Sequence, residues 1–277
     1  MLNPTPIEWV VNPDGSKPGY TYNPITGCLG GCGFCWAKRL ANGRLKPKYL
    51  ANNKIAPTDF VKDGKLIHVD YKKALNDPFY PRFWAEKDLL PKSKKPRGIF
   101  PVDMGDLFGI GVPEIWTRRV LALAYENPQD RFYLLTKQAQ NLIKFSPFPE
   151  NCWVGVSTTG NDCNSGFEDI FASIHATVKF VSIEPLKDYT PMDFRWVDWA
   201  IVGAETKNGK PVKENLPQIS WIKDIIKDCD ALGKPVFLKN NLMSVLPFDP
   251  IFREKDKHGV SMSFLRQEFP EVKVGVK

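Results

Sequence analysis

Short apolar runs, each closed by polar residues, recur along the chain from residue 98 onward. They are compact and rich in β-branched and aromatic residues, which is typical of buried parallel strands. We expect a first strand at 20–25 and further strands at 98–102, 131–135, 152–156, 178–183, 199–202 and 235–238.

Two segments between these runs have helical periodicity. Residues 113–126 begin with a proline near the first turn and end before Pro128, and residues 218–232 carry isoleucines at helical spacing and stop at Gly233. Strands that alternate with helices indicate parallel βα units. We therefore expect an α/β fold, a partial (β/α)6-type TIM-like barrel, with a doubly wound open sheet as the alternative. In both, function gathers at the carboxyl ends of the strands.

Residues 41–97 do not follow this alternation. We interpret them as an insertion after the first strand, within a single barrel domain of residues 1–277, and expect helix near 71–76 and 83–90. The insertion is rich in lysine, asparagine and proline and also holds aromatic residues. Its rings either stack on exposed nucleic-acid bases or pack the insertion onto the barrel; the clearest candidates are Phe79, Tyr80, Phe83 and Trp84.

The excess of positive charge lies in this insertion. The chain has 38 Lys and Arg against 31 Asp and Glu, and residues 41–97 hold 14 of the basic and 6 of the acidic ones. A concentrated surplus favours a surface that binds a polyanion such as DNA or RNA. A solvated basic surface without a partner is the alternative.

Length and composition exclude several classes of protein. The chain has 277 residues, 43% hydrophobic and 25% charged, close to the averages of globular proteins. No apolar run approaches the ~20 residues that span a bilayer, and the N-terminus lacks the layout of a secretion signal. We expect a cytoplasmic protein with no membrane partner.

Three of the six cysteines, Cys28, Cys32 and Cys35, form a CxxxCxxC cluster. A disulfide framework would need a secreted context, and closed zinc sites use four ligands, whereas no fourth Cys or His is nearby. Three thiolates leave one iron of a four-iron cluster without a protein ligand. A zinc site or another type of cluster is the alternative.

The CxxxCxxC spacing, with the aromatic Phe34 before the last cysteine and a strand in front, resembles the radical S-adenosylmethionine (SAM) superfamily. The resemblance implies a 4Fe-4S cluster on the three cysteines and SAM on the open iron. It also implies an external one-electron reductant such as flavodoxin or ferredoxin, and cleavage of SAM to a 5′-deoxyadenosyl radical that abstracts hydrogen from a C–H bond.

A narrower resemblance covers nearly the whole chain. Residues 22–28, 103–108 and 199–205 are similar to a phage and prokaryotic three-cysteine-motif family of unknown function, itself distantly similar to spore photoproduct lyase. This resemblance supports the same chemistry and leaves the substrate open.

The superfamily's SAM contacts can be carried over only by position. Gly105 and Asp106 stand where the superfamily has Gly-Gly-Glu, and the shorter acid departs from that pattern. Other polar residues after the strands are expected near the ribose, the adenine or the substrate, and strand-end caps are the alternative for each: Ser157, Thr158, Glu184, Gly203 and Glu205, with Thr136, Lys137, Lys239 and Asn240 completing the rim.

The remaining cysteines differ in context. Cys163 follows the expected strand at 152–156, and the likeness to photoproduct lyases makes it a candidate hydrogen-atom donor, with an ordinary loop thiol as the alternative. Cys152 opens that strand and Cys229 lies in the helix at 218–232, so both are interpreted as structural.

Three functional hypotheses follow. The first is a radical SAM enzyme that modifies or repairs a nucleic-acid base, which must be extruded or single-stranded to reach a barrel mouth. The second keeps the chemistry but acts on a small metabolite or peptide. The third is a non-catalytic nucleic-acid-binding protein stabilised by its metal.

Overall fold

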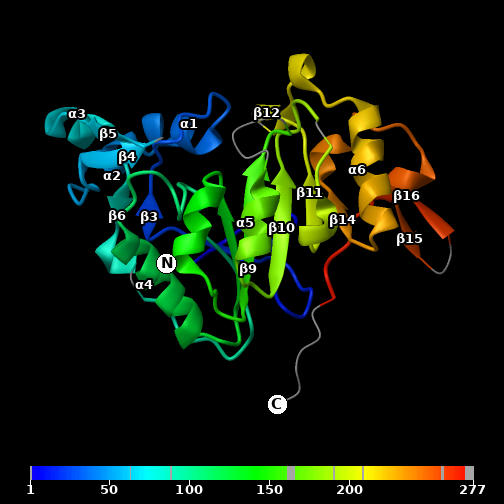
Figure 1. The fold of residues 1–277 in the computed structure, drawn as a ribbon, viewed down its shortest axis with the longest axis horizontal. Helices are drawn as coiled ribbons and strands as arrows, with labels where there is room; N and C mark the ends of the chain where they lie inside the picture. The colour runs from blue at the N-terminus through cyan, green and yellow to red at the C-terminus, as the bar shows by residue number, and fades with distance from the viewer. Residues whose placement is uncertain are drawn as a thin grey trace. The chain divides into compact units, whose positions relative to one another are not determined.

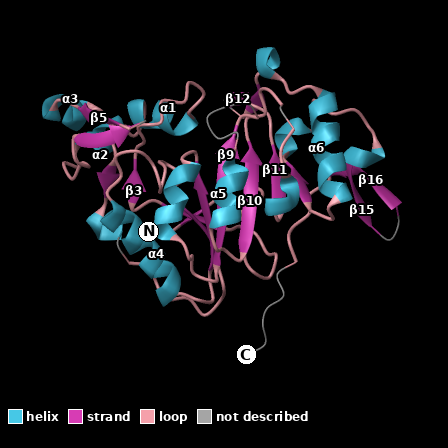
Figure 2. Ribbon diagram, viewed as in Figure 1, coloured by secondary structure: helices cyan, strands magenta, loops and turns pink. Residues whose placement is uncertain are grey.

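The structure is a computed structural model that describes residues 2–62, 64–87, 89–160, 166–189, 191–207, 209–256 and 259–271. The chain divides into two compact units, Met1–Cys152 and Trp153–Lys277. Figure 1 colours the chain from its N-terminus to its C-terminus, and Figure 2 shows that helices and strands are mixed along it.

The sheet strands of the first unit are β1 (Asn3–Pro4), β2 (Tyr20–Tyr22), β7 (Gly98–Pro101) and β8 (Arg131–Thr136), in the order β1-β2-β7-β8. β1 is antiparallel to β2, whereas β2, β7 and β8 run parallel. The predicted strands at 98–102 and 131–135 are confirmed. The predicted first strand is divided, because β3 (Ile25–Thr26) leaves this sheet and pairs with β6 (Arg82–Phe83).

The predicted helix at 113–126 is α4 (Glu114–Glu126), which follows β7 in the chain. Pro113 precedes its first turn, where the fixed φ of proline suits a helix start. The buried residues of α4 recur at helical spacing, so one stripe of the helix packs inward: Thr117, Val120, Leu121, Leu123 and Ala124. The 3-10 helix η2 (Ala139–Phe145) follows β8.

The insertion holds α1 (Trp36–Asn42, which begins before residue 41), α2 (Lys46–Leu50), the hairpin of β4 (Asp59–Lys62) and β5 (Lys65–His68), α3 (Tyr71–Asn76), β6 and the 3-10 helix η1 (Ala85–Lys87). The predicted helix near 71–76 is confirmed. The predicted helix near 83–90 was wrong beyond the three residues of η1. Phe83 and Trp84 donate their backbone N–H groups to the carbonyls of Lys54 and Pro24, so these groups are not available to a helix.

The aromatic residues of the insertion mostly form its core. Phe79, Tyr80 and Trp84 are 5%, 2% and 6% exposed, and Phe83 packs its ring against Trp116. These four rings therefore support the packing interpretation, since three of them lie inside the unit and are not available to stack on bases.

Two of the basic residues of the insertion are also internal. Arg82 is fully buried and donates hydrogen bonds to four backbone carbonyls, those of Asn52, Leu75, Asp77 and Tyr80. Arg97 is 6% exposed and pairs with the buried Asp130. Neither belongs to a basic surface, so the exposed positive charge of the insertion is smaller than its sequence indicates.

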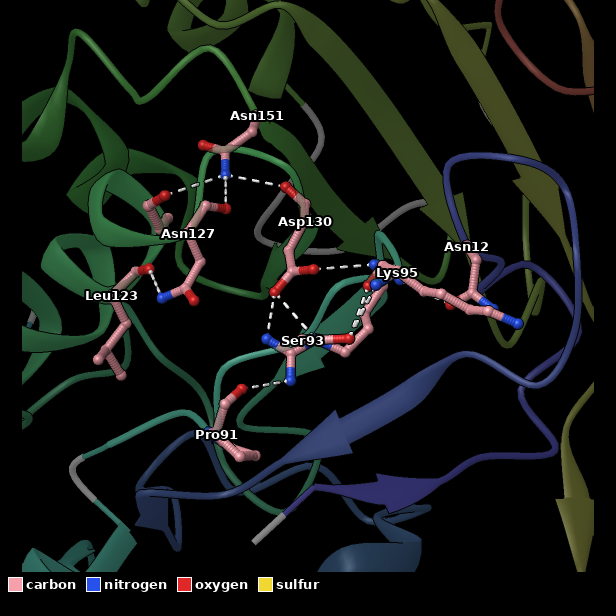
Figure 3. Close-up of polar contacts among 11 residues, drawn as sticks. Asn12, Pro91, Ser93, Lys95, Leu123, Asn127, Asp130 and Asn151 are labelled. Atoms are coloured by element: carbon pink, nitrogen blue, oxygen red, sulfur yellow. Dashed lines mark hydrogen bonds and ion pairs between the residues drawn. The ribbon is translucent and has the colours of Figure 1, made fainter.

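A buried polar network surrounds Asp130 before the start of β8 (Figure 3). The Asp130 carboxylate accepts hydrogen bonds from the backbone N–H and the guanidinium of Arg97, and the same guanidinium donates to the Pro91 carbonyl. The Asn151 amide donates to the carbonyls of Ala124, Asn127 and Asp130. The network joins the end of the insertion to the end of α4 and to the residue directly before β8.

The second unit contains β9 (Cys152–Thr158, whose first residue ends the first unit), β10 (Val178–Ile183), β11 (Trp199–Val202) and β14 (Val236–Leu238), in the order β9-β10-β11-β14. All three pairings are parallel. The four strands predicted from residue 152 onward are confirmed, and Ser157 and Thr158 are the last residues of β9 instead of following it.

Two α-helices accompany these strands, α5 (Phe167–Ser173) and α6 (Ile219–Ala231), and α6 confirms the helix predicted at 218–232. Two short hairpins complete the unit: β12 (Thr206–Lys207) with β13 (Lys210–Pro211), and β15 (Arg253–Asp256) with β16 (Gly259–Leu265). The remaining elements are 3-10 helices: η3 (Phe194–Trp196), η4 (Lys213–Asn215), η5 (Asn240–Leu242) and η6 (Pro250–Phe252).

Both units thus have mixed α/β structure with mostly parallel strands, as predicted. Across the part of the chain that the structure describes, every helix is too short or too polar to cross a bilayer.

Candidate functional site

The loop that carries the three cysteines is placed by an extension of the β2–β7 pairing. Beyond the two strands, Gly27 forms a parallel bridge with Gly105 and donates its N–H to the Met104 carbonyl at 2.9 Å. Cys28 then donates its N–H to the Phe79 carbonyl at 3.0 Å, so the insertion also fixes the start of the loop.

Gly27 is confined at this point to a conformation that only glycine adopts easily. Its φ is 87°, and a Cβ atom would lie 2.5 Å from the carbonyl oxygens of both Phe79 and Tyr80. The bridge on which the cysteine loop depends therefore requires a residue without a side chain.

Replacing Gly27 with alanine is expected to destabilise the first unit by about 3 kcal/mol, since it combines an unfavourable φ with a backbone clash. Gly15→Ala is the matched control, because Gly15 also has a positive φ but has no atom within 4 Å of the position of a Cβ. The measurement is the thermal unfolding midpoint. A Gly27→Ala midpoint no lower than that of Gly15→Ala would contradict the close packing at Gly27.

Asn23 ties the two sides of this bridge together. Its side-chain amide donates to the Asp103 carboxylate, and its side-chain oxygen accepts the N–H of Met104 at 3.0 Å. Residues 22–28 and 103–108, which carry the family resemblance, thus bind each other directly. The only sequence signal at Asn23 is its place directly before Pro24, which restricts it to extended backbone.

The apolar floor of the loop comes from α1, the insertion and the segment after β7. Cys28 and Cys35 pack against a cluster of buried side chains from these three places: Ala37, Ala41, Tyr49, Phe79, Trp84 and Met104. Trp84 also donates its indole N–H to Thr26 at 2.8 Å. The insertion is therefore part of the structure that supports the cysteines.

Two of the three sulfur atoms accept backbone hydrogen bonds. The Gly30 N–H donates to Cys28 Sγ at 3.2 Å, and the Lys38 N–H donates to Cys35 Sγ at 3.3 Å, which caps the start of α1. Burial, with a further contribution from the carboxylate of Asp106, raises the pKa of Cys28 to about 12. Burial also raises the pKa of Cys32, against the effect of the nearby Lys137 cation. The loop therefore favours neutral thiols unless a positive charge binds there.

The donor chemistry of this loop fits an iron–sulfur cluster. Three half-buried cysteine residues lie within eight residues of chain, and backbone amides donate to two of the sulfurs. The loop also has open space beside it, since a Cβ at Gly31 or Gly33 would meet nothing within 4 Å. The sulfurs are not gathered in advance, since among the described residues no three Cys, His, Asp or Glu side chains are arranged to hold a metal ion.

Gly105 and Asp106 lie in the same unit as the cysteines, in the segment that follows β7. A Cβ at Gly105 would lie 2.7 Å from the Gly27 carbonyl oxygen, so Gly105 is needed for the bridge. Asp106 is 6% exposed and its carboxylate accepts hydrogen bonds from Phe108 N–H, Thr136 Oγ1 and Lys137 N–H at 3.0, 2.7 and 2.9 Å. Burial raises the pKa of Asp106. The side chain thus joins the ends of β7 and β8.

Val102 adds a feature that no sequence signal indicates. It directly follows β7 with a φ of 62°, where a β-branched residue is strained, and its N–H donates to the Tyr22 carbonyl at 2.7 Å. The strained turn leads the chain from the sheet into the Asp103–Asp106 segment.

In the second unit, the predicted residues at the strand ends form a separate polar group. The Glu184 carboxylate pairs with the Lys239 ammonium, and the Ser157 hydroxyl donates to the Glu184 carbonyl at 3.4 Å. A Cβ at Gly203 would lie 3.0 Å from Lys239 Cδ and 3.1 Å from Glu184 Oε1, so this glycine leaves room for the ion pair. Thr158 is fully buried.

Glu205 pairs with Lys187 at 2.6 Å and accepts a hydrogen bond from Asn215 at 2.9 Å. Cys163 lies outside the described residues. Cys152 and Cys229 are buried, in agreement with their structural interpretation.

The chain belongs to the family described as "Protein of unknown function (DUF5131)", whose model matches residues 4–244. No curated protein and no solved structure matches the chain.

Proposed function

We propose that this protein is a radical SAM enzyme. The observation that carries the proposal is the position of Cys28, Cys32 and Cys35 in a loop tied by the Gly27–Gly105 bridge to the end of β7. Three thiol ligands leave a four-iron cluster with one iron open to a further ligand. When bound, such a cluster supplies the electron that cleaves SAM and starts hydrogen abstraction from a C–H bond.

In this proposal each part of the loop has a defined task. The three cysteines would hold the cluster, and the N–H groups of Gly30 and Lys38 would stabilise negative charge on two of the sulfurs. Gly105 allows the backbone of Gly27 to approach closely, and Asp106 holds the segments after β7 and β8 together beside the loop.

The finer parts of the fold and site belong to the same proposal. The parallel strands would build a partial (β/α)6-type barrel, and SAM and substrate would contact Ser157, Thr158, Glu184, Gly203 and Glu205. Glu184 and Lys239 form an ion pair that follows the ends of two strands. The carboxyl ends of parallel strands are where such folds bind their ligands, so these charged groups support the proposed contacts. An external one-electron donor such as flavodoxin or ferredoxin would reduce the cluster.

The experiment that tests the proposal is anaerobic reconstitution with iron and sulfide. We expect about four irons per chain and formation of 5′-deoxyadenosine from SAM that depends on dithionite. Zinc as the retained metal, with no SAM cleavage, would refute the proposal and leave a protein whose metal only holds its N-terminal loop.

We propose a base of DNA or RNA as the substrate, in single-stranded or extruded form. The support is the surplus of exposed cations in the insertion. Lys92, Lys94 and Lys95 are all exposed, and a run of such lysines neutralises phosphates and releases counterions. Because the aromatic residues of the insertion are mostly buried, affinity is expected to depend on charge more than on base stacking.

Replacing Lys92, Lys94 and Lys95 together with glutamine is expected to weaken binding to a fluorescent single-stranded oligonucleotide. The slope of log affinity against log salt should become less steep by about 2, because each of the three lost phosphate contacts contributes ~0.7 to its magnitude. The matched control replaces the exposed Lys207, Lys210 and Lys213 with glutamine and has the same change in net charge. Equal slopes for the two triple variants would favour a small metabolite or peptide as the substrate.

A further inference from the structure

Lys137 brings a positive charge against the cysteine loop. It is the first residue after β8, and its backbone N–H donates to Asp106 at 2.9 Å, which fixes where its side chain starts. Its Nζ atom lies 5.4 Å from the centroid of the Phe34 ring. Phe34 stands between Cys32 and Cys35, so the ammonium lies over the stretch of the loop that carries two of the three thiols.

Two basic side chains contact Phe34. The Lys137 ammonium lies over the face of its ring, where a cation is attracted by the ring's negative face, and the Arg39 guanidinium donates to its backbone carbonyl at 3.1 Å. Arg39 is exposed, whereas Lys137 is half-buried. A half-buried charge is screened less by water and salt, so Lys137 acts more strongly on the loop.

Two opposite charges lie close to the cysteine loop. The Asp106 carboxylate is buried and accepts the backbone N–H of Lys137, whereas the Lys137 ammonium lies over the Phe34 ring, between Cys32 and Cys35 in the chain. Lys137 therefore brings a positive charge to the side of the loop that carries these two cysteines.

We infer that Lys137 is a positioning residue that raises the reduction potential of the cluster held by Cys28, Cys32 and Cys35. The inference rests on the proposed function, because it needs the cluster to be present. Reduction transfers one electron from a donor to the cluster and adds one negative charge, which a nearby cation stabilises. Lys137 thus makes the first step of the proposed chemistry easier for a cellular one-electron donor.

The test is a potentiometric titration of the reconstituted protein with dithionite, followed by electron paramagnetic resonance without SAM. Lys137→Met should lower the equilibrium constant for reduction about tenfold, which corresponds to about 59 mV for one electron. Lys137→Gln should lower this equilibrium constant by the same factor. Lys137→Arg should leave it close to the wild-type value, because arginine keeps the positive charge. Lys144→Met removes an exposed lysine of the same unit that pairs with Glu114 at 4.0 Å, and should change nothing.

The inference is overturned if Lys137→Met and Lys137→Gln have the wild-type reduction potential. It is also overturned if the reduction potential of Lys137→Arg falls as far as theirs. A variant whose potential is unchanged but whose SAM affinity drops would show that Lys137 contacts SAM instead, and would also overturn it. Failure of the wild-type protein to assemble a cluster is a different result, because it removes the proposed function itself.

Discussion

Replacing Cys32 with alanine is expected to abolish cluster assembly, from about four irons per chain to almost none, and with it all cleavage of SAM. The reason is that Cys28 and Cys35 alone cannot provide the three protein ligands that the proposed cluster needs. Iron content after anaerobic reconstitution and 5′-deoxyadenosine by liquid chromatography are the two measurements.

Cys229→Ala is the matched control for Cys32→Ala. Cys229 is buried in α6 of the second unit, so its loss removes a thiol that the proposal does not use. We expect it to retain wild-type iron content. Full iron content and unchanged turnover in Cys32→Ala would count decisively against the cluster assignment.

The largest effect on stability is expected for Asp130→Ala. The side chain of Asp130 is fully buried, and it is the carboxylate partner of the buried guanidinium of Arg97. Removing it leaves Arg97 buried without a compensating charge, which costs about 3–5 kcal/mol. The midpoint of urea unfolding should shift accordingly.

Two further variants test the cause of that loss. The double variant Arg97→Met with Asp130→Leu removes both charges, and should recover most of the stability because no unpaired charge stays buried. Arg195→Ala breaks an ion pair with Asp193 from its exposed end and should leave the unfolding midpoint unchanged. A double variant as unstable as Asp130→Ala would show that packing, and not the unpaired charge, is responsible.

The sequence predicted the buried elements well. Strands such as Val178–Ile183 and Trp199–Val202 have the expected bounds, because a continuous apolar run closed by a polar residue or a glycine is buried on both faces in a parallel arrangement. The helices α4 and α6 begin and end within one residue of expectation, since Pro113 and Gly233 mark their limits.

The insertion could be predicted only in part. Charge and aromatic content are visible in the sequence, but whether a residue is exposed depends on contacts between distant segments. Arg97 counts as one of a basic run in the sequence and is buried on Asp130 in the structure. Trp84 likewise packs beneath the cysteine loop, so sequence proximity to lysines did not indicate its role.

The position of the cysteine loop could be predicted from the sequence, whereas the contacts that hold it in place could not. The spacing of the cysteines and glycines identified the loop, whereas the Gly27–Gly105 bridge, the Asn23–Asp103 contact and the strained Val102 depend on tertiary pairing. The periodicity of apolar residues indicates which positions are buried. It does not indicate which backbone groups pair across about 80 residues of chain.

The proposed chemistry depends on three thiols that hold a four-iron cluster with one iron open to SAM. The electron paramagnetic resonance spectrum of the reconstituted, dithionite-reduced wild-type protein, recorded with and without SAM, tests this arrangement. We expect the signal of a reduced 4Fe-4S cluster whose shape changes when SAM is added. A cluster signal that SAM leaves unchanged, or a protein that retains only zinc, would contradict it.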